Sequence, residues 1–190
     1  VHESELSADA AEKGDFPHYM LKEIHEQPRA VAQTLEERVA GGKLLEAAFG
    51  PAAQTVFAQT EAVRIVACGT SFHAASVAKY FIEQICRLPC WVEIASEYRY
   101  RNPVVPKNTL FVSVSQSGET ADTLAALRMA KQAGYLSQLA ICNVPESSLV
   151  RESELVMLTR AGPEIGVAST KAFTTQLTAL GMLVVALAKF

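Results

Sequence analysis

Short apolar runs alternate with helix-patterned stretches over the last two thirds of the chain. Five runs have the length and composition of buried strands, and they cover residues 63–68, 90–95, 110–114, 136–142 and 155–159. Helical patterning marks residues 72–87, 121–133 and 169–189. Strands that alternate with helices at this spacing form parallel β-α-β units. The sequence therefore predicts an α/β fold, a three-layer α/β/α sandwich around a mainly parallel five-stranded sheet.

The N-terminal third follows a different pattern. Residues 1–15 are rich in acidic residues and in small residues and have no periodic apolar face, so we expect a flexible linker or a segment boundary there. A helical segment that begins at His18 leads to Pro28, and residues 29–48 favour a second helical segment. Gly50 and Pro51 end it. Residues 16–190 are thus expected to form one domain with an N-terminal helical segment.

Composition and charge narrow the classes of partner. The 190 residues are 49% hydrophobic and 19% charged, which is typical of a globular domain with a sizeable core. A net charge of −3 disfavours nucleic acid and anionic membrane as partners, since both attract clustered Lys and Arg. The four cysteines lack the spacing of a zinc site, so we expect reduced thiols, no metal, and a cytoplasmic protein.

The last helix carries no charge from residue 172 to 188. Its continuous apolar part, residues 179–188, is shorter than the about 20 residues that a membrane span needs. A core or interface helix is therefore the preferred interpretation. A bare apolar helix would favour self-association, so we expect a homodimer. The chain stops inside this helix, at Phe190, which is expected of a piece of a longer protein.

The strongest chemical signal is the stretch Ser115-Gln116-Ser117-Gly118-Glu119-Thr120, which lies between a predicted strand and a predicted helix. The first backbone N–H groups of a helix lack intrahelical partners, and the helix dipole adds partial positive charge there. Hydroxyl and amide side chains add donors around a glycine. An ordinary capped turn is the alternative, but four donors at one strand end favour an anion site, most often for phosphate.

A second turn of the same kind follows the strand at residues 63–68. Gly69 permits a close backbone approach or a positive φ. Thr70 and Ser71 are equally compatible with a helix cap and with a ligand contact. Because ligands of such sheets bind at the carboxyl ends of strands, both turns are expected to surround one phosphate.

The start of the last helix offers further candidates. Ser169 is explained as an N-cap. Lys171 is unfavourable in a first turn, so it is expected to pair with a carboxylate, with an anionic ligand as the alternative. Glu164 lies in the preceding loop, and its alternatives are a solvated acid, a catalytic acid or base, and a hydrogen bond to a substrate hydroxyl.

Four long motifs closely resemble the glutamine:fructose-6-phosphate aminotransferases, also called glucosamine-6-phosphate synthases. These motifs cover residues 18–28, 93–101, 115–124 and 164–174, and the likeness extends from Phe16 to Phe190. It corresponds to the first of two sugar isomerase (SIS) lobes in that family, and it implies a flavodoxin-like sandwich. It also implies that the phosphate of fructose 6-phosphate or glucosamine 6-phosphate lies among Ser71, Ser115, Gln116, Ser117 and Thr120. Val167 and Ser169 would then meet the sugar hydroxyls.

Two parts of the family pattern have no counterpart in these residues. The family's glutaminase domain and its second SIS lobe are missing, and that lobe supplies the family's proton-transferring glutamate, ring-opening histidine and carbonyl lysine. The resemblance therefore implies a chain that binds sugar phosphate weakly without turning it over, with no metal or organic cofactor. The missing domains and a second copy would be its protein partners. Two alternatives are a non-catalytic sugar-phosphate sensor and a stand-alone isomerase with Glu164 or His73 as base.

Overall fold

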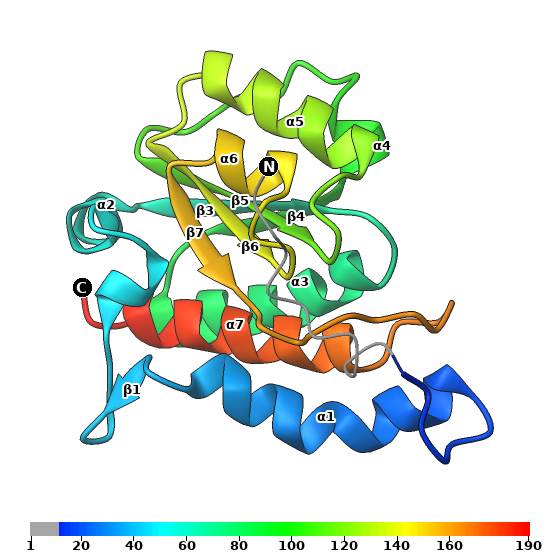
Figure 1. Ribbon diagram of the computed structural model, residues 1–190. Helices are drawn as coiled ribbons and strands as arrows, with labels where there is room; N and C mark the ends of the chain where they lie inside the picture. Colours follow the sequence, from blue (N-terminus) through cyan, green and yellow to red (C-terminus); the bar gives the residue numbers. More distant parts are fainter. Residues whose placement is uncertain (1–11) are drawn as a thin grey trace.

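The computed structural model describes residues 12–190, so the prediction for residues 1–15 falls largely outside the described part. Five parallel strands form the central sheet, in the order β4-β3-β5-β6-β7 (Figure 1). The strands are β3 (Ala62–Ala67), β4 (Cys90–Ile94), β5 (Thr109–Ser115), β6 (Ser137–Cys142) and β7 (Leu155–Leu158). The three inner strands are buried along their whole length, which explains their near-continuous apolar runs. The predicted five-stranded parallel α/β sandwich is confirmed.

Helices cover both faces of the sheet (Figure 1). One face carries α4 (Ala95–Tyr98), α5 (Ala121–Gln132) and α6 (Ser148–Glu152). The other carries α3 (Gly69–Phe81), which continues as the π-helical turn η3 (Ile82–Cys86), and α7 (Lys171–Leu187). A further helix, α1 (Tyr19–Leu35), lies against the outer side of α7, and the short helix α2 (Ala53–Gln59) precedes β3. Two apolar cores result, one on each face of the sheet.

The N-terminal segment differs from the prediction, because α1 continues through Pro28 without a break. Proline removes the N–H that would bond to the carbonyl of Ile24. The side-chain amide of Gln27 donates to this carbonyl instead, at 3.0 Å. The helix can therefore pass the proline with its backbone acceptor satisfied.

The predicted helix over residues 29–48 is wrong beyond Leu35. A hairpin follows, with β1 (Val39–Ala40) paired to β2 (Lys43–Leu44), and then a 3₁₀ turn η2 (Glu46–Phe49). Gly41 and Gly42 connect the strands with φ of 56° and 72°. Two consecutive positive φ values are the geometry of a tight hairpin turn, so the glycine pair outweighs the apolar spacing.

The uncharged last helix is a core element. Eleven of its side chains are buried, because α1 and α3 both pack along it. Its apolar surface is therefore covered within this chain, and the expectation that it is bare is wrong. Across residues 12–190 we find no helix with the length and apolar character to cross a membrane.

Candidate functional site

The two serine turns lie side by side. β3 and β5 are neighbours in register, with Ala67 opposite Val114, so both strands end at the same edge of the sheet. β3 leads into the turn at residues 68–71 at the start of α3, and β5 leads into residues 115–120 before α5. The two turns therefore face one space, and the expectation that a phosphate lies between them stays a prediction.

A cavity of about 190 Å³ occupies this space. Its lining residues are Cys68, Ser71, Val114, Ser115, Gln116, Ser117, Thr120 and Thr123. None of them carries a formal charge, so any anion bound here would meet hydroxyl, amide and backbone N–H donors only. Such fixed dipoles at a helix start are sufficient to bind phosphate.

The serines of the loop stabilise its shape through their oxygen atoms. Ser115 Oγ accepts from the N–H of Gly118 at 3.0 Å, and Ser117 Oγ accepts from the N–H of Glu119 at 3.2 Å. A hydroxyl that accepts in this way still has its own proton to donate. Both serines can therefore serve the loop and a bound anion together.

Gly118 is required at the loop centre for two reasons. Its φ of +68° is in the left-handed region, and a Cβ there would lie 2.2 Å from Ser147 Oγ and 2.8 Å from Cys142 Sγ. Any larger residue would push the loop away from the neighbouring strand end. The loop backbone is thereby held close to β6.

The N-terminus of α5 opens towards the same cavity. Thr120 is its N-cap residue, but no side chain caps the helix. The free N–H groups and the dipole of this 12-residue helix are thus available to an anion.

Thr123, one turn into α5, is a candidate site residue that the sequence reasoning missed. Its side chain is 1% exposed, it lines the cavity, and its Oγ1 has no hydrogen-bond partner within residues 12–190. Thr120 and Thr123 are three residues apart and so share a helix face, which is the signal that could have found it.

The remaining predicted contacts lie outside this cavity. Thr70 is exposed and does not line it. Val167 is fully exposed and Ser169 is half-buried, and both belong to the loop between β7 and α7. Their predicted contacts with a sugar stay predictions.

A larger cavity, of about 660 Å³, lies on the other side of Gln116. Gln116 lines both cavities, and Asn143 and Glu164 line the larger one. Asn143 fixes one wall, since its side chain donates to Gly162 O at 2.8 Å and accepts from the N–H of Ala161 at 2.7 Å. A ligand with an anionic head in the small cavity would have space for a polar body here.

Glu164 caps the last helix, and the prediction that Ser169 is the N-cap is wrong. The carboxylate of Glu164 accepts from the N–H groups of Thr170 and Ala172 at 2.8 and 3.1 Å, and from the hydroxyl of Ser169 at 3.2 Å. The cap position itself is Thr170, whose side chain makes no cap bond. A carboxylate at a helix N-terminus stabilises the helix dipole, so this acid has a structural role in the observed geometry.

Helix α1 holds the same loop from the other side. Glu23 is 2% exposed, and its carboxylate accepts from the N–H groups of Ile165 at 2.6 Å and Gly166 at 3.1 Å. A Cβ on Gly166 would lie 2.6 Å from Glu23 Oε2, so only glycine allows this approach. The loop that carries Val167 and Ser169 is therefore positioned by α1.

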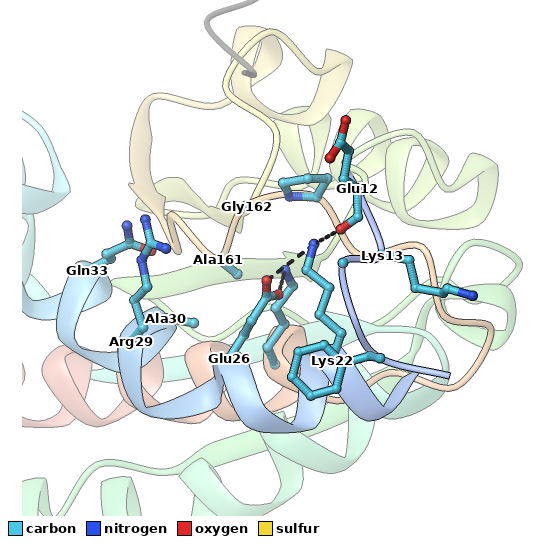
Figure 2. A pocket seen from close by; sticks show the side chains of 13 residues that line it. Glu12, Lys13, Lys22, Glu26, Arg29, Ala30, Gln33, Ala161 and Gly162 are labelled. Carbon is cyan, nitrogen blue, oxygen red and sulfur yellow. Dashed lines mark hydrogen bonds and ion pairs between the residues drawn. The ribbon is translucent and has the colours of Figure 1, made fainter. Parts of the chain in front are cut away.

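Lys171 pairs with Glu26 of α1 at 2.6 Å, which confirms the expected carboxylate partner. The pair borders a cavity of about 480 Å³, where Lys22 also lies 3.5 Å from Glu26 (Figure 2). Burial, the largest single effect, would raise the pKa of Glu26, but the hydrogen bonds and charges of Lys171 and Lys22 together outweigh burial and lower it. Over residues 12–190, no three His, Cys, Asp or Glu side chains gather as metal ligands.

Comparison with known proteins places this geometry in a family. The model of the SIS domain matches residues 57–186, which include both serine turns and most of α7. The chain belongs to the SIS domain family. This SIS domain is 63% identical over 180 residues to the glutamine–fructose-6-phosphate aminotransferase [isomerizing] of Pseudomonas syringae, and 58% identical over 189 residues to that of Legionella pneumophila. The alignments cover 95% and 100% of the chain but only 30% and 31% of those relatives, so the chain spans about a third of their length.

Solved structures agree with this assignment. The SIS domain superposes with a TM-score of 0.92 on the C-terminal domain of glucosamine-fructose-6-phosphate aminotransferase from Francisella tularensis, at 55% identity over 94% of this chain and 50% of that one. A glucosamine-6-phosphate deaminase from Thermotoga maritima superposes with a TM-score of 0.72 at 24% identity, covering 90% of this chain and 49% of that one. The second likeness shows the fold alone.

Proposed function

We propose that the chain is the sugar-phosphate-binding lobe of a glutamine:fructose-6-phosphate aminotransferase. The parent protein would convert fructose 6-phosphate and glutamine to glucosamine 6-phosphate and glutamate. The observation that carries the proposal is the uncharged cavity at the ends of β3 and β5, where hydroxyl groups and a helix N-terminus converge. The identity to aminotransferases over nearly the whole chain supports it.

The phosphate ester would lie in the cavity of about 190 Å³. Its oxygens would accept hydrogen bonds from the hydroxyl groups of Ser71, Ser115, Ser117 and Thr120. The side-chain amide of Gln116 would lie beside them. Charge-assisted hydrogen bonds of this kind are about twice as strong as neutral ones. The sugar body would extend past Gln116 into the larger cavity, where the loop that carries Val167 and Ser169 can reach its hydroxyls.

Chemistry on the sugar would require groups from the rest of the parent protein. General acid–base catalysis needs a side chain within hydrogen-bond reach of the proton it moves. Glu164, which lies nearest in sequence to the predicted sugar contacts, is engaged by the first amides of α7. The proposal therefore assigns binding to this lobe and turnover to the second SIS lobe, without metal or organic cofactor.

The parent would be a cytoplasmic homodimer. All four cysteines are free thiols, as expected of a reducing compartment. An apolar stripe on α3 and η3 supports the dimer, because it is exposed at spacings that place its members on one helix face. The stripe consists of Val77, Tyr80, Phe81 and Ile85, which are 41–72% exposed.

A titration tests the proposal. Fructose 6-phosphate added to the chain should shift the amide NMR signals of Ser71 and Ser117 in a saturable way, whereas unphosphorylated fructose should not.

Ser117→Ala should weaken binding about tenfold, since one charge-assisted hydrogen bond is lost. Ser153→Ala, at the residue that follows α6 and outside the cavity lining, is the matched control. With ammonia supplied, neither glucosamine 6-phosphate nor glucose 6-phosphate should form. Equal binding of fructose, or shifts at other residues alone, would contradict the proposal.

A further inference from the structure

Arg38, just beyond the end of α1, is a buried cation without an acidic partner. Its side chain is among the buried charged groups, with the residue 5% exposed. Its Nη1 donates to the backbone carbonyl of Thr34 at 2.8 Å, and no carboxylate within residues 12–190 lies within 4 Å of it. Charged side chains are almost never fully buried unless they are paired. The position of Arg38 therefore requires an explanation outside the fold itself.

A second guanidinium stands beside it. Arg160, which follows the end of β7, pairs with Glu37 at 3.2 Å. Burial and the positive charge of Arg160 together lower the pKa of Arg38 to about 10, against the opposing effect of Glu37. Arg38 therefore stays protonated at neutral pH. Two positive charges and one negative charge leave one positive charge unneutralised.

Both arginines line one cavity, of about 430 Å³, at the free edge of β7. Apart from Glu37, the other lining residues are apolar: Leu45, Ala47, Ala48, Val156 and Leu158. The cavity shares no lining residue with the cavity between the serine turns. Arg160 and Leu158 also line the larger cavity beside Gln116, so the two cavities adjoin there, whereas Arg38 and Leu45 line this cavity and not the larger one. The cavity has a cationic end and an apolar wall.

We propose that this cavity binds an organic monocarboxylate with a short apolar chain. The guanidinium group presents its N–H donors in a planar fork that matches the two oxygens of a carboxylate. A single negative charge balances the one unneutralised positive charge, whereas a phosphate dianion would exceed it. The apolar chain would cover the side chains from η2 and β7 that water now contacts.

The probe for the test is 4-methylpentanoate, with its neutral amide 4-methylpentanamide and inorganic phosphate as comparisons. We expect saturable shifts of the backbone amides of Leu45 and Arg160 in the NMR spectrum of the chain with the carboxylate. The neutral amide and phosphate should bind at least about tenfold more weakly, because they lack the charge or the apolar chain. Saturable binding of the neutral amide or of phosphate with equal or higher affinity would overturn the proposal.

Two variants locate the site. Arg160→Asn removes one of the two cations of the cavity. Asn suits this backbone position, because Arg160 has φ of 52° and Asn tolerates that region. Arg87→Asn is the matched control, since Arg87 has φ of 58° and does not line the cavity. Leu45→Asp places a repelling charge at an exposed wall position. Binding should fall about tenfold or more in the first and third variants and stay unchanged in the control.

Unchanged carboxylate binding in Arg160→Asn and in Leu45→Asp, or no saturable binding by the wild-type chain, would refute the site. The response of Ser117 to fructose 6-phosphate should stay the same in Leu45→Asp and Arg87→Asn, because these two residues line neither cavity of the sugar-phosphate proposal. A loss of that response would concern the sugar-phosphate proposal, so the two tests are distinguishable.

Discussion

The buried hydroxyl of Thr123 allows the contribution of one side chain to the candidate site to be tested. A buried hydroxyl without a partner costs about 1–3 kcal/mol, and a phosphate oxygen in the cavity would supply the missing acceptor. Thr123→Val removes the hydroxyl at nearly constant volume. We expect about tenfold weaker binding of fructose 6-phosphate, with the free energy of unfolding unchanged or slightly raised. Calorimetric titration and urea unfolding measure the two quantities.

The control is Thr175→Val, at a buried position in the second turn of α7. Thr175 is equally buried, but its hydroxyl already donates to Ala172 O at 3.1 Å. This change should alter stability and leave the affinity for the sugar phosphate as it is. If Thr123→Val bound fructose 6-phosphate as tightly as the wild type, Thr123 would be no ligand.

The same residues show where sequence reasoning succeeds at this scale. Ser115 and Ser117 are readable because several donors follow directly after an apolar strand. Thr123 is not, because a threonine one turn into a helix occurs for many reasons and only the cavity distinguishes it. Glu164 is misread because its partners are backbone N–H groups six and eight residues downstream, and no side-chain pattern records them.

At the scale of elements, α1 acts on the site loop through Glu23. Among the described residues, the buried carboxylate has only the N–H groups of Ile165 and Gly166 as partners. Glu23→Gln would turn an amide NH₂ towards one of these donors. We expect the hydrogen-exchange protection of Ile165 and Gly166 to fall and the unfolding free energy to drop by about 1–3 kcal/mol. Exchange mass spectrometry or NMR measures the protection.

Glu36→Gln is the matched change at the exposed end of the same helix. It should leave both amides protected and the stability within about 0.5 kcal/mol of wild type, as is usual for surface substitutions. Unaltered exchange of Ile165 and Gly166 in Glu23→Gln would show that α1 does not position the loop.

The elements themselves follow from the sequence to different degrees. The five strands are predicted to within a residue or two, because buried parallel strands are the most continuous apolar runs. The path after Leu35 is not predicted, because apolar residues at helical spacing also suit a hairpin once Gly41 and Gly42 supply the turn. Pro28 is misjudged because the bond from Gln27 to Ile24 compensates for the proline only in three dimensions.

At the scale of the whole molecule, one face of the sheet carries two layers of helix. α7 lies between α3 and α1, which explains a helix without charge from residue 172 to 188. The covering by α1 could not be predicted, because an amphipathic N-terminal helix fits any apolar face of similar width. The position of α1 along α7 is visible only in the structure, where the Lys171–Glu26 ion pair joins the two helices at 2.6 Å.

That pair makes the stability of the molecule depend on acid pH in a defined direction. The folded state lowers the pKa of Glu26 below its ordinary 4.5, because Lys171 and Lys22 together outweigh the opposing effect of burial. The stabilisation is therefore complete above pH 4.5 and is lost as the pH falls through the lowered folded value. Glu26→Gln should lack this part of the acid-dependent loss, and at pH 7 it should be less stable by about 1–3 kcal/mol, with the partial exposure of Glu26 taken into account.

Urea unfolding between pH 7 and pH 3 tests the direction. The curves of wild type and Glu26→Gln should converge as the pH falls below 4.5, because Glu26 becomes neutral in the wild type as well. Glu83→Gln is the control, since Glu83 pairs with Lys79 at 3.8 Å on an exposed helix face, and such pairs contribute little. Its curve should run parallel to that of the wild type. A constant difference between wild type and Glu26→Gln from pH 7 to pH 3 would mean that the charge of Glu26 does not stabilise the packing of α1 on α7.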